Sequence, residues 1–187
     1  MKSVVVFFAD GFEECEGLLV VDLLRRAGVN VTTASIMGKM DIISSHNVAL
    51  RTDALAEEVD FEAADMIVLP GGLPGTTYLG ESRIVREKCL EFAASAAAGK
   101  YVAAICAAPS VLAGLGLLEG KPATCHPNFE GKMCGAVVTR ESVTVTGNII
   151  TGRGLGAGIP FALKLIEILV DKEAAEKVAG SICFVGV

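Results

Sequence analysis

The feature that most constrains the fold of this chain is a series of short apolar runs, separated from one another by polar or helical sequence. The runs are mostly apolar and rich in β-branched residues, which is typical of strands buried on both faces of a parallel sheet. They cover Ser3–Phe8, Val29–Ala34, Met66–Leu69, Tyr101–Ile105 and Ile149–Thr151. We therefore expect these runs to form the central sheet.

Segments with helical spacing of apolar residues lie between and after these runs. They cover Leu18–Ala27, Arg83–Ala98, Cys106 to about Leu115, Ile159–Val170 and Lys172–Ala179. The alternation predicts an α/β sandwich with a mostly parallel central sheet, helices on both faces and right-handed crossovers. Met40–Leu50 is interpreted as an antiparallel β-hairpin or an excursion at the sheet edge, and Ala136–Thr146 as a β-hairpin. Without a repeat or linker, 187 residues predict one domain over residues 1–187.

Composition excludes several classes of protein. Sixteen basic residues against 22 acidic ones give a net charge of -6, which argues against binding to nucleic acid or an anionic membrane. The uncharged stretch Tyr101–Leu118 is interrupted by Pro109 and Gly114, so we interpret it as a buried strand and helix instead of a membrane span. The N-terminal apolar run ends at Asp10, too early for an export signal. We expect a cytoplasmic protein.

The six cysteines form no C-x-x-C pair, and no His, Cys or Asp spacing resembles a zinc ligand set. We expect no metal and no disulfide framework. Cys106 is distinctive because it stands between a predicted strand and a predicted helix, with small residues around it. Such a turn constrains a nucleophile, and the amides of the helix N-terminus would lower the pKa of the thiol. The alternative is a buried cysteine in an alanine-rich helix.

Ligands of parallel sheets bind at the carboxyl ends of the strands, where Asp10–Gly17, Pro70–Gly75 and Cys106–Pro109 should meet. A carboxylate of the first loop that points at Cys106 could be protonated and donate a hydrogen bond to the thiolate, although solvated carboxylates at a helix start are commoner. Amides of the second loop, together with the one after Cys106, could hold an oxyanion. An ordinary glycine turn is the alternative.

The chain has two histidines. His126 opens a polar loop and could exchange protons with the thiol, although a lone histidine is more often structural. His46, in a polar turn, is interpreted as a surface residue. Arg153, in a glycine-rich segment, could anchor a carboxylate. No phosphate-binding loop motif is present.

Together these motifs resemble the ThiJ/PfpI superfamily, and in particular the branch of the Parkinsonism-associated protein deglycase and its bacterial relatives. The resemblance covers essentially the whole chain, with the motifs in family order. It rests on Asp10–Glu16, Leu69–Gly72, Ala103–Pro109, His126–Pro127 and Gly152–Gly156.

The resemblance implies a flavodoxin-like sandwich and a homodimer. It places the nucleophile at Cys106, its protonated carboxylate partner at Glu16 and the pocket histidine at His126. It assigns the oxyanion and substrate contacts to Gly72, with Gly71 beside it, and to Ala107.

The activity implied is cofactor-free conversion of α-oxoaldehydes such as methylglyoxal to hydroxy acids, together with deglycation of protein side chains that carry the same aldehyde. The expected partners are therefore a small aldehyde or glycated side chains. Two alternatives stay open: a redox-sensing stress protein or chaperone that oxidises Cys106, and, more distantly, a cysteine peptidase or amidase.

Overall fold

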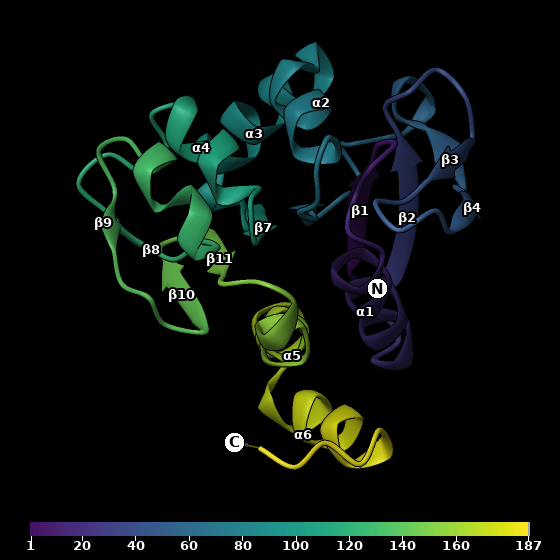
Figure 1. The fold of residues 1–187 in the computed structure, drawn as a ribbon. Coiled ribbons are helices and arrows are strands. Elements are labelled where there is room, and N and C mark those ends of the chain that lie inside the picture. The colour runs from purple at the N-terminus through teal and green to yellow at the C-terminus, as the bar shows by residue number, and fades with distance from the viewer. Residues whose placement is uncertain (187) are drawn as a thin grey trace.

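The computed structural model describes residues 1–186 as a three-layered α/β sandwich (Figure 1). Val187, the last residue of the predicted domain, lies outside the described residues. The main sheet has seven strands in the order β10-β11-β7-β6-β1-β2-β5. Its strands are β1 (Ser3–Phe8), β2 (Asn30–Ser35), β5 (Ala54–Leu55), β6 (Met66–Leu69), β7 (Tyr101–Ile105), β10 (Val143–Thr146) and β11 (Ile149–Gly152).

All neighbouring strands of this sheet are parallel except β10, which pairs with β11 in antiparallel orientation at one edge. Each strand predicted from the apolar runs is present, with ends within a residue or so of those expected. The flavodoxin-like sandwich with a mostly parallel sheet and helices on both faces is confirmed.

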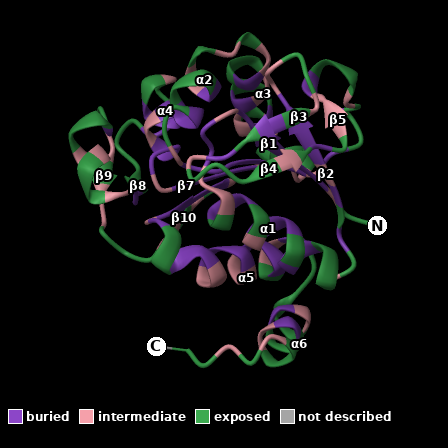
Figure 2. Ribbon diagram, turned by 45° about the vertical axis from the view of Figure 1, so that its right-hand side comes forward, coloured by how far each residue is buried: buried purple, intermediate pink, exposed green. Residues whose placement is uncertain are grey.

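Helices cover the sheet on both sides (Figure 2). The helices are α1 (Glu14–Arg26), α2 (Gly75–Glu81), α3 (Arg83–Ala94), α4 (Pro109–Gly114), α5 (Gly158–Leu169) and α6 (Lys172–Ser181). Short 3₁₀ turns are η1 (Ala56–Glu58), η2 (Ala96–Ala98), η3 (Pro127–Lys132) and η4 (Leu155–Ala157). Helix α2 was not predicted from the sequence. Among the described residues, no helix is long and apolar enough to cross a membrane.

Successive side chains of β1 point alternately into two separate hydrophobic clusters, one on each face of the sheet. Val4, Val6 and Phe8 belong to the cluster that includes residues of α1, α5 and α6, whereas Val5 and Phe7 belong to the cluster that includes residues of α2, α3 and α4. Successive side chains of a strand point to opposite faces, and every one of these five is buried. A continuous apolar run was therefore the correct signal for a strand covered on both faces.

One predicted hairpin is confirmed and the other is wrong. The first, Met40–Leu50, is confirmed: β3 (Asp41–Ile43) and β4 (Ala49–Arg51) pair in antiparallel orientation, and β4 ends one residue later than expected. Within Ala136–Thr146, however, β9 (Val137–Val138) pairs with β8 (Pro122–Ala123), and β10 pairs with β11.

The true hairpin turns at Gly147 and Asn148, where Gly147 has a φ of +58°. A two-residue turn that contains a glycine is a stronger hairpin signal than Arg140 and Glu141, the charged pair between the two β-rich pieces of Ala136–Thr146.

Candidate active site

The site lies where the carboxyl ends of three adjacent strands, β1, β6 and β7, meet. The N–H of Glu13 donates to the carbonyl of Gly71 at 2.8 Å and joins the first loop to the second. The third loop lies beside them, because a Cβ atom at Gly71 would be 2.6 Å from Cβ of Cys106. The N–H of His126, in the segment after β8, donates to the carbonyl of Cys106 at 2.8 Å. The predicted meeting of the three loops at one end of the sheet is confirmed.

Cys106 follows β7 directly and has a left-handed backbone conformation, with a φ of +65°. A non-glycine residue seldom adopts this conformation, and it is concentrated at functional sites. The N–H of Cys106 donates to the carbonyl of Gly152 at 2.9 Å, and this bond ties the turn to the neighbouring strand. Helix α4 begins only at Pro109, so Cys106 lies on the turn itself, as a nucleophile on a strand-to-helix elbow does.

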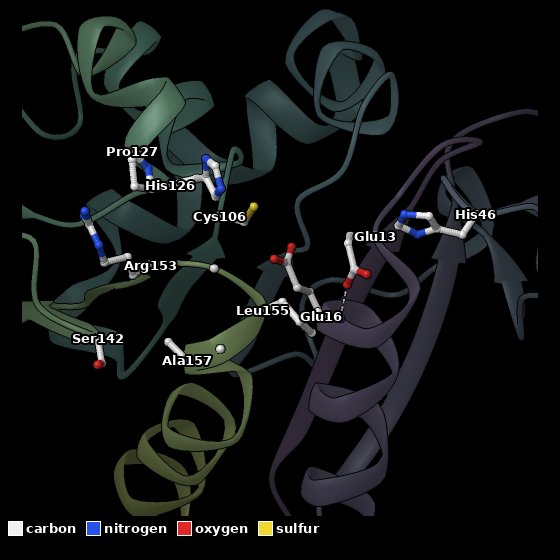
Figure 3. A pocket seen from close by; sticks show the side chains of 12 residues that line it. Glu13, Glu16, His46, Cys106, His126, Pro127, Ser142, Arg153, Leu155 and Ala157 are labelled. Atoms are coloured by element: carbon white, nitrogen blue, oxygen red, sulfur yellow. Dashed lines mark hydrogen bonds between the residues drawn. The ribbon is translucent and has the colours of Figure 1, made fainter. Parts of the chain in front are cut away.

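Glu16 is the carboxylate that faces this thiol (Figure 3). Helix α1 begins at Glu14, four residues before its predicted start, and this places Glu16 in its first turn. Glu13 caps the helix by accepting the N–H of Glu16 at 2.7 Å. The side chain of Glu16 points inward, is only 1% exposed, and accepts the N–H of Gly71 at 3.1 Å. The solvated alternative does not hold for Glu16.

Burial raises the pKa of Glu16 to about 7, with the charge of Glu13 adding to the effect. Hydrogen bonds from Cys106 and from the N–H groups of Gly71 and Leu155 act in the opposite direction. Loss of hydration disfavours a carboxylate more than these donors restore it. The carboxyl group can therefore both hold and release a proton near neutral pH.

The pKa of the Cys106 thiol is raised to about 12 by burial, and next by the charge of Glu16 and their hydrogen bond. The N–H groups of Ala107 and Gly72 lower it, as expected of amides directed at the sulfur. The predicted lowering of the thiol pKa by the turn is wrong, because burial and the adjacent charge of Glu16 together outweigh the amides. Ionisation of the thiol is therefore tied to protonation of Glu16.

The two glycines of the second loop have different roles. Gly72, with a φ of +92°, directs its N–H at Cys106. Gly71 does not contribute a free amide to the pocket, because its N–H is bound to Glu16. A Cβ atom at Gly71 would lie 2.5 Å from Oε2 of Glu16 and 2.6 Å from Cβ of Cys106. The predicted substrate contact at Gly71 is therefore a positioning role, in which a residue without a side chain lets the two groups approach.

A pocket of about 550 Å³ opens in front of the pair, and Cys106, Glu16 and His126 all line it. The Nδ1 atom of His126 accepts the N–H of Asn128 at 3.2 Å, so the neutral ring carries its proton on Nε2. Figure 3 shows the imidazole on the opposite side of Cys106 from Glu16. The structure thus brings together the three predicted catalytic residues.

Sequence reasoning missed part of the pocket. Leu155 contributes an N–H to Glu16, and the glycine-rich segment around it was the available signal. Arg153 lines the pocket, but its guanidinium pairs with Glu130 at 3.3 Å, so it already has a carboxylate partner within the chain. His46 is 71% exposed at its side chain, as a surface residue should be, and yet it borders the pocket.

Ligand atoms of Glu13, Glu14 and His46 lie within 4.8 Å of one another. These groups already have partners: Glu13 caps α1, and Glu14 contacts Nδ1 of His46 at 2.8 Å. A helix cap and a hydrogen bond account for the closeness of these side chains.

The fold and site define a class of protein: an α/β sandwich with a cysteine on the elbow after a central strand and a buried carboxyl group beside it. The chain belongs to the DJ-1/PfpI family, whose model matches residues 2–168. It is 38% identical over 180 residues to the protein dj-1beta of Drosophila melanogaster, with 95% of each chain covered.

Other comparisons agree. Protein DJ-1 homolog B of Arabidopsis thaliana is 37% identical over 181 residues. The match covers 96% of this chain and 41% of that relative. A glutathione-independent glyoxalase of Caenorhabditis elegans, DJR-1.2, is 28% identical over 184 residues, covering 97% of this chain and 96% of the relative. The structure of oxidized Toxoplasma gondii DJ-1 superposes with a TM-score of 0.92 at 36% identity over the full length of both chains. The family thus includes a protein named as a glyoxalase.

Proposed function

We propose that this chain is a glutathione-independent glyoxalase in which Cys106 is the nucleophile, acting without a cofactor on α-oxoaldehydes such as methylglyoxal. The observation that carries the proposal is the hydrogen-bonded pair formed by the half-buried Cys106 and the buried Glu16, both of which line a pocket. The name of the Caenorhabditis elegans relative supports the same reaction.

In the first step, the sulfur of Cys106 forms a bond to the aldehyde carbon and the thiol proton passes to the Glu16 carboxylate. The carbonyl π electrons move to oxygen, and the N–H groups of Gly72 and Ala107 are placed to stabilise the developing oxyanion. Protonation of that oxygen gives a hemithioacetal. Proton transfer in concert with attack avoids the unfavourable state in which both groups are charged.

In the second step, the hydrogen on the former aldehyde carbon leaves as a proton, giving an enediol, and a proton is returned to the adjacent carbon. The product is a thioester of the 2-hydroxy acid. Glu16 and His126 are the titratable groups placed to carry these protons. Water then cleaves the thioester, releasing lactate from methylglyoxal and restoring the thiol. The overall reaction adds one water and needs no oxidant or reductant.

The test is lactate formation from methylglyoxal by purified protein without glutathione. Turnover should be lost in Cys106→Ser and strongly reduced in Glu16→Gln. If the unmodified protein with a reduced Cys106 forms no lactate, the glyoxalase proposal is overturned.

The same chemistry extends to deglycation, because early aldehyde adducts of side chains release or present the same carbonyl carbon. The pocket volume of about 550 Å³ is large compared with a three-carbon aldehyde. Decay of a preformed methylglyoxal–cysteine adduct should be followed at increasing enzyme concentration. A rate that keeps rising above that of spontaneous adduct dissociation supports direct deglycation, whereas a plateau at the spontaneous rate shows that only free aldehyde is consumed.

A redox-sensing role is the second candidate, favoured by the donors around Cys106. The Toxoplasma gondii relative has been solved in an oxidized form. In this chain, a protonated Glu16 and the amides of Gly72 and Ala107 would donate hydrogen bonds to the charged oxygens of a Cys106 sulfinate, as they would to an oxyanion. Intact-mass and peptide analysis after peroxide should then show added oxygen at Cys106 before the exposed Cys15, Cys134 and Cys183.

We further propose a homodimer in the cytoplasm, as the family resemblance implies. Light scattering coupled to size exclusion would measure the mass directly. A monomer at micromolar concentration would contradict the proposed dimer.

A further inference from the structure

A second pocket, of about 240 Å³, shares Leu73 and Phe129 with the space around Cys106. Its other walls come from α2, the first turn of α3, α4 and η3. Figure 1 shows α2, α3 and α4 on the same side of the sheet. None of the residues assigned to the proposed reaction lines this pocket.

The pocket is cationic in an acidic protein. Arg86 and Lys132 line it, and no aspartate or glutamate does. Within residues 1–186, Arg86 is the one arginine that forms no ion pair, and Lys132 forms none either. In a chain with a net charge of -6, two cations without a carboxylate in one pocket favour an anionic ligand.

Neighbouring groups hold both cations at the pocket. The guanidinium of Arg86 donates to the carbonyl of Gly80, at the end of α2, at 3.3 Å. This bond involves one nitrogen and leaves the other donors of the guanidinium free. The ammonium group of Lys132 lies 4.9 Å from the centre of the Phe129 ring, which is itself a wall of the pocket.

Thr76 provides an independent observation. It lines the pocket and is only 4% exposed, and its Oγ1 has no hydrogen-bond partner among the described residues. Buried hydroxyl groups are nearly always paired, because an unpaired one loses its hydration without compensation. A ligand oxygen in the pocket would give this hydroxyl an acceptor after a turn about χ1. Thr77, next in the chain, adds a second hydroxyl to the same wall.

We propose that this pocket binds a phosphate group, either free or as the end of a small phosphomonoester. The two cations supply only donors, the threonine hydroxyls can each donate one hydrogen bond, and the planar guanidinium matches two oxygens of a phosphate. A doubly charged phosphate compensates both cations, which a single carboxylate does not. Because the pocket shares two walls with the Cys106 site, an ester would extend toward that site through Leu73 and Phe129.

The experiment is a titration of the full chain with inorganic phosphate at constant ionic strength, followed by amide chemical shifts in NMR. Saturable shifts should centre on α2, the start of α3 and η3. Arg86→Gln and Lys132→Gln should each weaken binding by about tenfold, the contribution expected of a charge-assisted hydrogen bond. The control is Arg83→Gln on the same helix, because Arg83 pairs with Glu87 and does not line the pocket.

Thr76→Val separates a ligand contact from a structural role. It should weaken phosphate binding about fivefold while leaving the melting temperature of the phosphate-free protein unchanged or higher, because it removes an unpaired buried hydroxyl. A parallel titration with glycerol 3-phosphate identifies the source: tighter binding than phosphate indicates an ester, and equal binding indicates the free ion. Linear, non-saturating shifts, or shifts unaffected by Arg86→Gln, would overturn the proposal. Lactate assays play no part in this test, so it stands or falls separately from the proposed reaction.

Discussion

Two thiols, the buried Cys89 in α3 and the half-buried Cys106 on the turn after β7, have pKa values shifted in the same direction but very different surroundings. The pKa of each is raised to about 12, and burial is the largest cause in both. For Cys89 burial is the only cause, because the side chain is 0% exposed and packed in the core. Around Cys106, by contrast, a carboxyl group, two amides and a pocket converge.

The difference shows that acidity in the resting protein does not identify a nucleophile. A buried thiol becomes reactive where a proton acceptor, anion-stabilising donors and access for substrate meet at the sulfur. Cys89 has none of these, and its role is packing, because it lies at helical spacing with Val85 and Phe92 on the buried face of α3. Single substitutions can test whether these local groups, and not the thiol itself, separate the two cysteines.

The largest effect is expected from removing each thiol in turn. Cys106→Ser should lower kcat for lactate formation by at least about 10³-fold, because the nucleophile itself is replaced by a much weaker one. Cys89→Ser should leave kcat within about twofold while lowering the free energy of unfolding by about 1–2 kcal/mol, since it buries a hydroxyl in an apolar core. The measurements are steady-state kinetics and urea unfolding. Equal loss of activity in both variants would contradict the assignment of Cys106 as the nucleophile and Cys89 as a packing residue.

The next effect concerns the carboxyl group that Cys89 lacks. Glu16→Gln should lower kcat by about 10²–10³-fold, since an amide cannot accept the thiol proton. In the unmodified protein, turnover should rise with pH as Glu16 ionises near pH 7. That inflection should be absent from the residual activity of Glu16→Gln. A pH profile shared by both proteins would assign the titration to another group.

Glu16 should also affect stability as a function of pH. Its pKa is raised from 4.5 in the unfolded chain to about 7 in the folded protein, so the folded state binds more protons between these values. The free energy of unfolding should therefore fall as pH rises from about 4.5 through 7, by on the order of 3 kcal/mol. Glu16→Gln should lack this fall. Asp10, Asp53 and Asp65, whose pKa values are lowered, act in the opposite sense at more acidic pH.

Much of the fold could be predicted because its signals are local. Continuous apolar runs such as Ser3–Phe8 give the buried strands, and strand–helix alternation gives the parallel topology. Helix α2 lacked such a signal: Gly75–Glu81 contains two threonines and two glycines, which are weak helix formers. Packing against α3 and α4 holds this short helix in place.

The site was predictable in part for the same reason. The elbow at Cys106 is a local pattern, whereas the burial of Glu16 depends on three loops that are distant in sequence. Spacing alone left every carboxylate of Asp10–Glu16 as a candidate, and only the family resemblance selected one. The pKa of Cys106 was misjudged because the amides are visible in the sequence pattern, whereas the burial of the sulfur and the opposing charge of Glu16 are not.

A smaller effect is expected at Gly71, the glycine that lies against both Glu16 and Cys106. Gly71→Ala should destabilise the protein by about 1–3 kcal/mol and lower kcat, because its Cβ would lie 2.5 Å from Glu16 and 2.6 Å from Cys106. Gly180→Ala in α6 is the matched control, since nothing lies within 4 Å of its Cβ position and alanine favours a helix. Thermal unfolding and lactate formation should both be measured. A Gly71→Ala variant as active and stable as the control would show that the close approach has no role.

The smallest effect is expected at His126, which tests whether Glu16 suffices as a proton carrier. His126→Asn keeps a side-chain oxygen that can accept the N–H of Asn128, so the start of η3 should be preserved while the titratable ring is lost. We expect kcat to fall by about tenfold, because Glu16 can still take the thiol proton but proton transfer between the two carbons slows. His46→Asn is the control, since His46 also borders the pocket but pairs with Glu14 at its edge. If both variants keep full activity, one carboxyl group carries every proton, and it alone accounts for the contrast between Cys106 and Cys89.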